Sequence, residues 1–453
     1  MKKITLVGGG LAGSLLSIYL AKRGLEVDLY ERRPDMRTVD ISAGRSINMA
    51  LSARGIYALR EVDVLDDIMQ QAIAMRGRMI HAVDGTLSFL PYGKDDSEVI
   101  YSISRGGLNM ALLSAAERQH GVRIHFNEQC THYDVRTGTT TFQNADSNAT
   151  KTIETSVVIG TDGSASAIRT AMLSVPRFNF SQHYLDHGYK ELTIPPDAGG
   201  GFQIEKHALH IWPRGQYMLI ALPNPDGSFT CTLFLPFEGE LSFENLQNEQ
   251  AVRRFFEQHF PDAVPLMPTL IDDFFTNPTG ALATVRCWPW RVGGRAALLG
   301  DAAHAIVPFF GQGMNCAFED CTVLNQCIEQ HEGDWERIFI EYERERKVNA
   351  DAIADLALAN FIEMRDSVAD AGFALKKDVE LALEKRFPDR FIPKYSMVSF
   401  HRIPYAVAQA RGRQQAAILE RLCRDIDGVE GLDWGVAKRI IEQELPLVKQ
   451  EKF

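Results

Sequence analysis

The sequence contains no run of about 18 apolar residues, the length that a membrane-spanning helix requires. Its first apolar run, residues 4–7, is too short for a signal peptide, and three glycines end it at once. The C-terminus, residues 445–453, is charged and carries no hydrophobic tail. We therefore expect a soluble, cytoplasmic protein with no membrane anchor.

Paired cysteines are also missing. The seven cysteines are scattered, their number is odd, and none belongs to a Cys-X-X-Cys pair. This pattern excludes a disulfide framework and the common zinc-binding spacings. We expect reduced thiols and no metal site.

The chain has fewer basic than acidic residues: 48 Lys and Arg against 59 Asp and Glu, which gives a net charge of -11. An acidic chain repels phosphates, so we expect no nucleic-acid partner. The basic residues of segment 343–347 alternate with acids, which is typical of a solvated helix face. No internal repeat or low-complexity segment is present.

The order of predicted elements indicates an α/β protein. The chain opens with a strand, a glycine turn, a helix and a second strand. Strand-like runs at 208–236, joined by Asn-Pro-Asp-Gly, predict a second, antiparallel sheet inserted into a Rossmann-like domain. From about residue 335 onward the pattern is mostly helical. We expect interleaved nucleotide and substrate domains over 1–375, with the substrate sheet mainly at 175–280, and a helical region at 376–453 that covers the active site.

The opening turn fits the Gly-X-Gly-X-X-Gly dinucleotide fingerprint at Gly8, Gly10 and Gly13. Glycines there allow a tight turn and a close approach of backbone to a pyrophosphate, which the helix N-terminus binds. Glu31 follows the second strand, where an acid binds a ribose hydroxyl. The fingerprint alone does not separate FAD from NAD.

Two later motifs favour FAD. Asp162 and Asp301 each follow an apolar strand, where a carboxylate is well placed to accept hydrogen bonds from a ribityl chain. Segment 308–315 is a glycine-bearing loop that opens a helix, and the helix N-terminus would hold negative charge on the flavin.

In this order, the three motifs resemble the single-component flavoprotein aromatic hydroxylases typified by p-hydroxybenzoate hydroxylase. Arg105, at the start of a predicted helix, matches the flavin-contacting arginine of that family. A second fingerprint for a nicotinamide cofactor is missing, as in that family. The resemblance implies non-covalently bound FAD and NADPH that docks only transiently.

Further stretches at 44–51, 75–81, 91–93, 187–192, 209–213, 360–364 and 391–398 resemble the branch of this family that hydroxylates L-kynurenine. The likeness extends over almost the whole chain. It implies that cofactor contacts come from the three motifs and from segments that follow the strands. The residues so implied are Gly8, Gly10, Leu11, Ala12, Gly13, Glu31, Arg32, Arg33, Arg45, Ala50, Arg105, Cys130, Asp162, Asp301, Gly313, Met314 and Asn315.

By the same resemblance, Arg78, Tyr92, Asn360 and Tyr405 bind the amino-acid end of the substrate. A guanidinium fork suits an α-carboxylate, and phenol hydroxyls add hydrogen bonds. Taken singly, Arg78 also fits a surface salt bridge and the tyrosines also fit the edge of a core. The candidates for an apolar pocket around the aromatic ring, which also fit core packing, are Leu209, Met218, Ile220, Phe234, Pro308 and Phe309.

The implied reaction consumes NADPH and O2 and gives 3-hydroxykynurenine through a flavin C4a-hydroperoxide, in tryptophan degradation and pyridine nucleotide synthesis. Because the flavin supplies the chemistry, we assign no catalytic side chain. The resemblance favours a bacterial protein and allows a homodimer. Two other functions stay open: hydroxylation of a phenol or quinone precursor, which needs no carboxylate clamp, and a flavoprotein module for redox-controlled protein binding, which needs a docking surface.

Overall fold

The computed structural model describes residues 3–39, 48–364 and 371–448. These residues form two compact units, each assembled from segments that are distant in the sequence. The first unit takes its described residues from 1–72, 103–184 and 283–354, and the second from 73–102, 185–282 and 355–453. The predicted α/β class, with a Rossmann-like domain, an inserted sheet and C-terminal helices, is confirmed.

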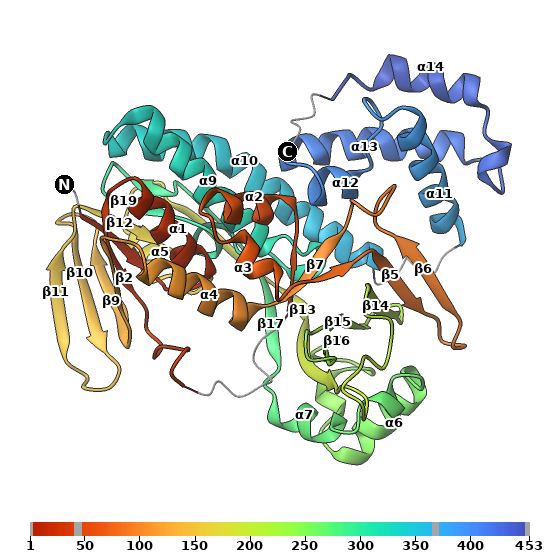
Figure 1. The fold of residues 1–453 in the computed structure, drawn as a ribbon, viewed down its shortest axis with the longest axis horizontal. Coiled ribbons are helices and arrows are strands. Elements are labelled where there is room, and N and C mark those ends of the chain that lie inside the picture. The colour runs from red at the N-terminus through yellow and green to blue at the C-terminus, as the bar shows by residue number, and fades with distance from the viewer. Residues whose placement is uncertain (1–2, 40–47, 365–370, 449–453) are drawn as a thin grey trace. The chain divides into compact units, whose positions relative to one another are not determined.

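A six-stranded sheet in the order β18-β19-β12-β1-β2-β8 organises the first unit (Figure 1). Its pairs are parallel except for β18 with β19. Parallel strands are usually covered on both faces, which agrees with the burial of every residue of β12 and of all but the first residue of β1. The strands are β1 (Lys3–Val7), β2 (Glu26–Tyr30), β8 (Val122–His125), β12 (Val157–Gly160), β18 (Arg291–Val292) and β19 (Ala296–Leu298).

Helices and a small sheet complete the first unit. Helix α1 packs against α4 and α9, and α2 packs against α9. The helices are α1 (Leu11–Lys22), α2 (Ala53–Glu61), α3 (Leu65–Met69), α4 (Arg105–Glu117), α5 (Ala167–Met172), α8 (Asp301–His304), the 3-10 helix η3 (Pro308–Phe310) and α9 (Gly313–His331). The remaining strands are β3 (Asn48–Leu51) and an antiparallel meander of β9 (Glu128–Asp134), β10 (Thr139–Asn144) and β11 (Thr150–Glu154).

The second unit is built on a sheet with the order β17-β13-β16-β15-β14-β5-β6, in which β14 and β5 are parallel. Strands β5 and β6 lie outside the predicted range 175–280, so the sheet draws on an earlier part of the chain. Strands β13 and β17 each run across a boundary between the units in the sequence. The strands of this sheet are β5 (Gly77–His81), β6 (Leu87–Pro91), β13 (Asn179–Ile194), β14 (Ala208–Pro213), β15 (Met218–Pro223), β16 (Phe229–Pro236) and β17 (Gly280–Trp288). Strands β4 (Ile73–Met75) and β7 (Ile100–Ser104) pair with each other outside this sheet.

One face of this sheet packs on α6 (Glu249–His259) and α7 (Leu270–Thr276), with Trp212, Leu219 and Leu233 in the shared core. The C-terminal helices form a separate core that includes Leu383, Ile418 and Ile441. They are α10 (Trp335–Ile362), which begins in the first unit, α11 (Ala371–Arg386), α12 (Lys394–Ser399), α13 (Tyr405–Leu422) and α14 (Trp434–Glu444).

Segment 343–347 lies on α10 and is only partly the solvated face that its charges predicted. Arg344 is exposed, but Glu343 and Arg346 are buried. These two residues are three positions apart and therefore share the inward face of the helix. Glu343 accepts a hydrogen bond from the backbone of Trp290, so buried partners replace water. The prediction was wrong for these two positions.

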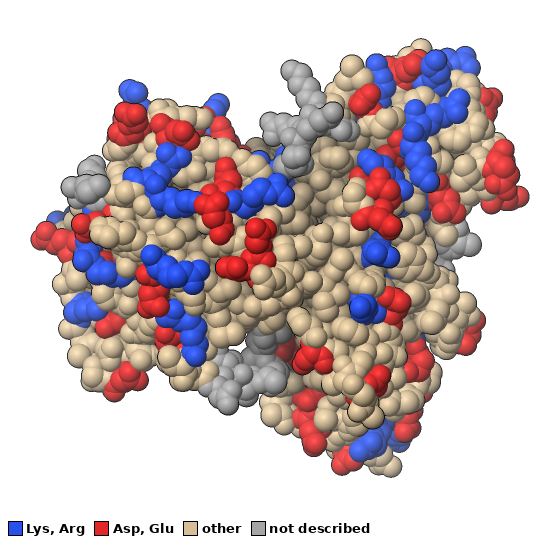
Figure 2. Space-filling view, in the orientation of Figure 1, with Lys and Arg blue, Asp and Glu red and all other residues tan. Residues whose placement is uncertain are grey.

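Surface charge is mixed. On the face in Figure 2, Lys and Arg lie among Asp and Glu instead of forming one basic surface. Within the described ranges, no helix combines the length and the apolar character that crossing a membrane requires.

Candidate active site

The β1–α1 turn in the first unit has the geometry of a phosphate-binding site. Gly8 has a φ of 109°, and a Cβ on it would lie 2.5 Å from the carbonyl oxygen of Thr161. A Cβ on Gly10 would meet nothing within 4 Å, so open space adjoins the start of α1. The helix has no side-chain cap and no acid in its first turn. Its N-terminal N–H groups therefore remain available to an anion.

Glu31 directly follows β2 and is buried beside this turn. One carboxylate oxygen accepts a hydrogen bond from the Gly9 N–H at 2.7 Å. The other accepts from the Arg33 backbone and from its Nε. The carboxylate thus holds the glycine loop in place at the position where the fingerprint predicts a ribose contact.

Asp162 and Asp301 lie just beyond the ends of the neighbouring strands β12 and β19. Asp162 Oδ2 accepts from the Ala167 N–H, while its buried Oδ1 has no hydrogen-bond partner among the described residues. Burial raises the pKa of Asp301, although the positive charge of Arg105 lowers it. By surface area, Asp301 is nevertheless exposed to solvent. A buried carboxylate oxygen without a partner and an accessible acid fit a polyhydroxylated cofactor.

The start of α9 also lacks a side-chain cap and an acid in its first turn. Asn315 is fully buried there, donates to the carbonyls of Ala50 and Gly311, and accepts from the Ser52 N–H. Its side chain therefore braces the loop against β3. Any cofactor contact from this residue would come from its backbone.

The other predicted cofactor residues belong to the same unit, except that Arg45 lies outside the described residues. Leu11 and Ala12 begin α1, Arg32 and Arg33 follow Glu31, Cys130 is on β9, and Gly313 and Met314 begin α9. Burial raises the pKa of the Cys130 thiol to about 12, so this cysteine stays protonated. Leu11, Ala12, Arg32 and Arg33 follow the carboxyl ends of β1 and β2, where α/β sheets bind ligands.

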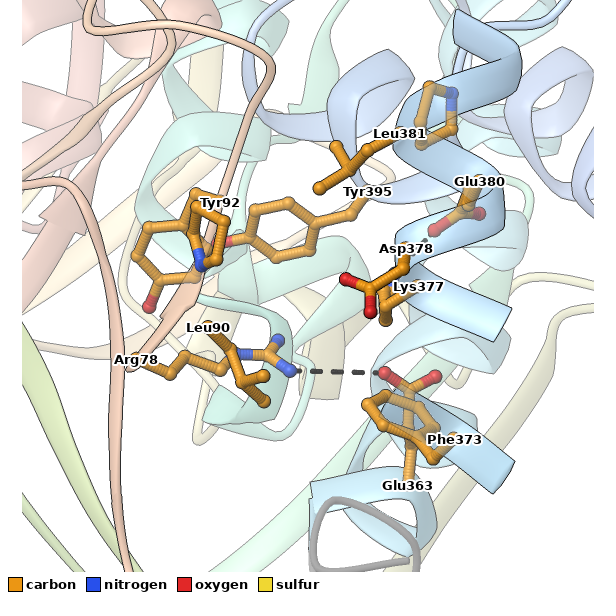
Figure 3. A pocket seen from close by; sticks show the side chains of 12 residues that line it. Arg78, Leu90, Tyr92, Glu363, Phe373, Lys377, Asp378, Glu380, Leu381 and Tyr395 are labelled. Carbon is orange, nitrogen blue, oxygen red and sulfur yellow. Dashed lines mark hydrogen bonds and ion pairs between the residues drawn. The ribbon is translucent and has the colours of Figure 1, made fainter. Parts of the chain in front are cut away.

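A pocket in the second unit contains two of the predicted substrate residues, Arg78 and Tyr92 (Figure 3). The β5–β6 hairpin contributes one wall, and α11 with the start of α12 contributes another. The rings of Tyr92 and Tyr395 stack with centroids 5.0 Å apart, and the Arg78 guanidinium lies 5.3 Å from the Tyr395 ring. The lining consists of Arg78, Leu90, Pro91, Tyr92, Glu363, Phe373, Lys377, Asp378, Glu380, Leu381, Pro393 and Tyr395.

Arg78 is buried without a close counter-ion. Its Nη1 lies 3.9 Å from Glu363, and its Nε has no hydrogen-bond partner among the described residues. Burial opposes its charge, but Tyr92, Tyr395 and Glu363 hold the pKa of the guanidinium above its usual value. Burial also opposes the charge on Glu363, yet Lys394 and Lys377 hold the pKa of that carboxyl below its usual value. Both groups remain charged at neutral pH.

Four predicted ring-binding residues share one face of the sheet with Arg78. Leu209 pairs with Arg78 across β14 and β5, and Met218 pairs with Phe234 across β15 and β16. Ile220 is two residues from Met218 and therefore points to the same side. The opposite face carries the core against α6 and α7.

The remaining predicted substrate residues are more dispersed. Asn360 is buried near the end of α10, three residues before Glu363. Pro308 and Phe309 belong to the first unit, on η3. Tyr405 is fully buried at the start of α13 and is not among the residues that line the pocket. The second tyrosine beside Arg78 is Tyr395.

Sequence reasoning did not select Tyr395, Glu363 or Lys377. The first two lie inside the stretches 391–398 and 360–364, so the resemblance already pointed to their neighbourhood. Lys377 is on α11 and had no signal beyond its charge.

Comparison with known proteins decides the family. A family model described as an FAD binding domain matches residues 1–357. A kynurenine 3-monooxygenase from Myxococcus xanthus is 52% identical over 448 residues, or 99% of this chain and 96% of the relative. One from Dictyostelium discoideum is 46% identical, over 98% of each chain. The chain belongs to the kynurenine 3-monooxygenase family.

Solved structures agree on the fold of this family. The tetrameric form of 2-methyl-3-hydroxypyridine-5-carboxylic acid oxygenase has a TM-score of 0.68 at 20% identity and covers 83% of this chain and 96% of that one. A p-nitrophenol 4-monooxygenase from Pseudomonas putida has a TM-score of 0.63 at 17% identity, over 94% and 98%. The chain is a flavin-dependent monooxygenase that binds FAD.

Proposed function

We propose that this chain hydroxylates L-kynurenine at the ring 3-position, with NADPH and O2 as co-substrates. The curated relatives support this assignment, because they carry the name kynurenine 3-monooxygenase over nearly their full length. The products are 3-hydroxykynurenine, NADP+ and water, a step in tryptophan degradation that leads toward pyridine nucleotide synthesis.

The observation that carries the proposal is the pair of buried Arg78 and partly buried Glu363, 3.9 Å apart in an aromatic pocket. Their separation exceeds a hydrogen bond, so each retains capacity for another partner. A free amino acid presents a carboxylate and an ammonium on one carbon. The guanidinium suits the carboxylate and Glu363 suits the ammonium. A phenol without an amino-acid end would use neither.

Around this pair, Tyr92 and Tyr395 would add hydrogen bonds to the carboxylate, and Asn360 would support the ammonium side. Tyr405 stays a candidate on the resemblance alone. The aromatic ring would lie on the sheet face, against Leu209, Met218, Ile220 and Phe234, with Pro308 and Phe309 as further candidates.

FAD would be held in the first unit by the β1–α1 turn, Glu31, Asp162, Asp301 and the start of α9. When bound, it transfers electrons from NADPH and supplies the activated oxygen atom. The aniline nitrogen of kynurenine already enriches the ortho ring carbon in electrons, so no side chain need deprotonate the substrate. The residues of this chain therefore act by orienting the ring and excluding water.

The test is NADPH oxidation by the FAD-loaded protein with a panel of aromatic metabolites. The panel contains L-kynurenine, its decarboxylated analogue, p-hydroxybenzoate and a quinone precursor. We expect fast oxidation and stoichiometric 3-hydroxykynurenine with L-kynurenine alone, and slow oxidation without substrate. Equal rates with a phenol that has no amino-acid end would contradict the substrate assignment. A homodimer and a cytoplasmic location stay predictions for light scattering and cell fractionation.

A further inference from the structure

The short helix α8 begins with Asp301 and follows an unusual turn. Gly300, its N-cap, has φ 62° and ψ -141°, a conformation that essentially only glycine adopts. A Cβ at this position would also lie 3.1 Å from the Cβ of Ala317 on α9. With four residues, the helix cannot fix its own geometry. Its orientation must therefore be set from outside.

Asp320 on α9 contacts both ends of this segment. Its Oδ2 accepts a hydrogen bond from the Gly300 N–H at 3.1 Å and lies 2.6 Å from Nε2 of His304. Although burial opposes a charge on the imidazole, Asp320 holds the pKa of His304 well above its usual value. One carboxylate oxygen thus bridges the residue before Asp301 and the residue that ends the helix.

A buried arginine fixes Asp320 in turn. Arg346 Nε donates to Asp320 Oδ1 at 2.7 Å, and its Nη1 donates to Glu319 Oε2 at 2.6 Å. Glu319 also accepts from Arg54 at 3.1 Å. One side-chain nitrogen, sulfur or oxygen atom from each of His304, Cys316 and Asp320 lies within 4.8 Å of the other two. Arg346 also contacts Cys316 Sγ. The group is a hydrogen-bonded charge cluster.

Arg169, which follows the Asp162 motif, also contacts α8. Its Nη1 donates to the carbonyl of Ala302 at 2.8 Å, and its Nη2 contacts the carbonyl of Ser164. Arg169 therefore links two cofactor motifs through the backbone of α8. Only Asp320 reaches both ends of the segment by side-chain contacts that the structure describes.

We propose that Asp320 is a positioning residue for FAD, which clamps Gly300 and His304 so that Asp301 is presented to the ribityl chain. This inference rests on the proposed contact between Asp301 and FAD. Asp320 itself makes no contact with FAD in this proposal. It limits the orientations of Asp301 before binding, so binding loses less conformational freedom.

The chain offers a matched control for the clamp. Glu319 and Asp320 are consecutive, both are buried, and both accept from Arg346. Asp320 also contacts Gly300 and His304 at the two ends of α8, whereas the hydrogen bonds described for Glu319 join it to Arg54 and Arg346. Asp320→Asn and Glu319→Gln therefore each remove one carboxylate from the same arginine. Only Asp320→Asn also changes the contacts with Gly300 and His304.

The experiment titrates FAD into apo-protein prepared from the full chain and follows flavin fluorescence, with urea unfolding of each apo-protein in parallel. For Asp320→Asn we expect the FAD dissociation constant to rise at least about tenfold, because a charged buried hydrogen bond is lost. For Glu319→Gln at similar apo stability we expect less than about a threefold change. Equal weakening in both variants, or no change in Asp320→Asn, would overturn the clamp.

A double-mutant cycle separates this inference from the assignment of Asp301. If Asp320 acts through Asp301, Asp320→Asn will cost little further affinity in an Asp301→Asn background, whereas independent effects add and contradict the proposal. Unchanged affinity in Asp301→Asn alone would refute the Asp301 contact instead. Should Asp320→Asn fail to fold, His304→Gln breaks the same clamp from the α8 side and keeps Asp320 paired with Arg346. Unchanged FAD affinity in His304→Gln would then overturn the proposal.

Discussion

Arg346 and Arg78 are both buried arginines, but only Arg346 has carboxylates within hydrogen-bond distance. Arg346 donates to Asp320 and Glu319 at 2.7 and 2.6 Å. Arg78 is 3.9 Å from Glu363, and its Nε has no partner among the described residues. A buried charge without close partners is costly unless a ligand completes it. On our proposal, the Arg346 charge stabilises the fold, whereas the Arg78 charge binds the carboxylate of the substrate.

The largest effect should come from exchanging each arginine for methionine. Arg346→Met removes one charged partner from each of two buried carboxylates and should lower the free energy of unfolding by about 3–5 kcal/mol. Arg78→Met removes a poorly paired charge, while Glu363 keeps Lys394 at 3.8 Å. Its stability should stay within about 1 kcal/mol of the parent. Urea unfolding of both FAD-loaded variants measures the two changes in stability. Equal destabilisation would contradict the difference that we infer between the two arginines.

Glu384 extends the comparison of buried charges from the two arginines to a buried acid. Its Oε1 lies 3.8 Å from Lys94 Nζ, and neither oxygen has a hydrogen-bond partner in the described ranges. Burial, with Glu98 nearby, raises the pKa of Glu384 to about 8. The folded protein therefore holds a proton that the unfolded chain releases at lower pH. The stability that this proton confers is complete below the unfolded pKa and is lost as pH rises through the folded one.

Glu384→Gln should remove this dependence. Relative to the variant, the parent should lose up to about 1.4 kcal/mol of stability per pH unit between roughly pH 5 and 8. Denaturant unfolding at several pH values measures the difference, with the exposed Glu420→Gln on α13 as the control. Parallel curves for the parent and Glu384→Gln would show that Glu384 titrates normally.

The smallest effect concerns two tyrosines. Tyr395 lines the pocket and stacks on Tyr92, whereas Tyr405 is fully buried at the start of α13. Tyr395→Phe should weaken L-kynurenine binding by about 0.5–1.5 kcal/mol, because one hydrogen bond to the carboxylate is lost. Tyr405→Phe should alter stability more than binding. The Michaelis constant for L-kynurenine, measured for both variants, tests this prediction. A larger increase in Tyr405→Phe than in Tyr395→Phe would support the substrate-binding role that the resemblance implied for Tyr405.

Local motifs explain what the sequence could predict. The β1–α1 turn, Glu31 and the acids after β12 and β19 are readable because each is a short segment whose strand, turn and helix are consecutive. The inserted sheet was readable for β14 to β16, which are joined by a tight turn. Strands β5 and β6 were not assigned to it, because β5 pairs with β14 about 130 residues away and short strands carry weak patterns.

Buried charge was the main element that the sequence concealed. Segment 343–347 predicted a solvated face, but Arg346 meets carboxylates on α9, 26 and 27 residues earlier. Charge alone does not say whether water or another side chain is the partner. The choice between Tyr395 and Tyr405 was hidden for a similar reason, since it depends on how α12 and α13 pack.

The most direct test of the central claim is a calorimetric titration of the FAD-loaded protein with L-kynurenine and with its decarboxylated analogue, in the parent and in Arg78→Met. If Arg78 is completed by the substrate carboxylate, the parent should prefer L-kynurenine by roughly 2–5 kcal/mol and the variant should lose most of that preference. The analogue should bind both proteins with similar affinity. If Arg78→Met weakened both ligands equally, or left the preference intact, Arg78 would not be the site of the carboxylate.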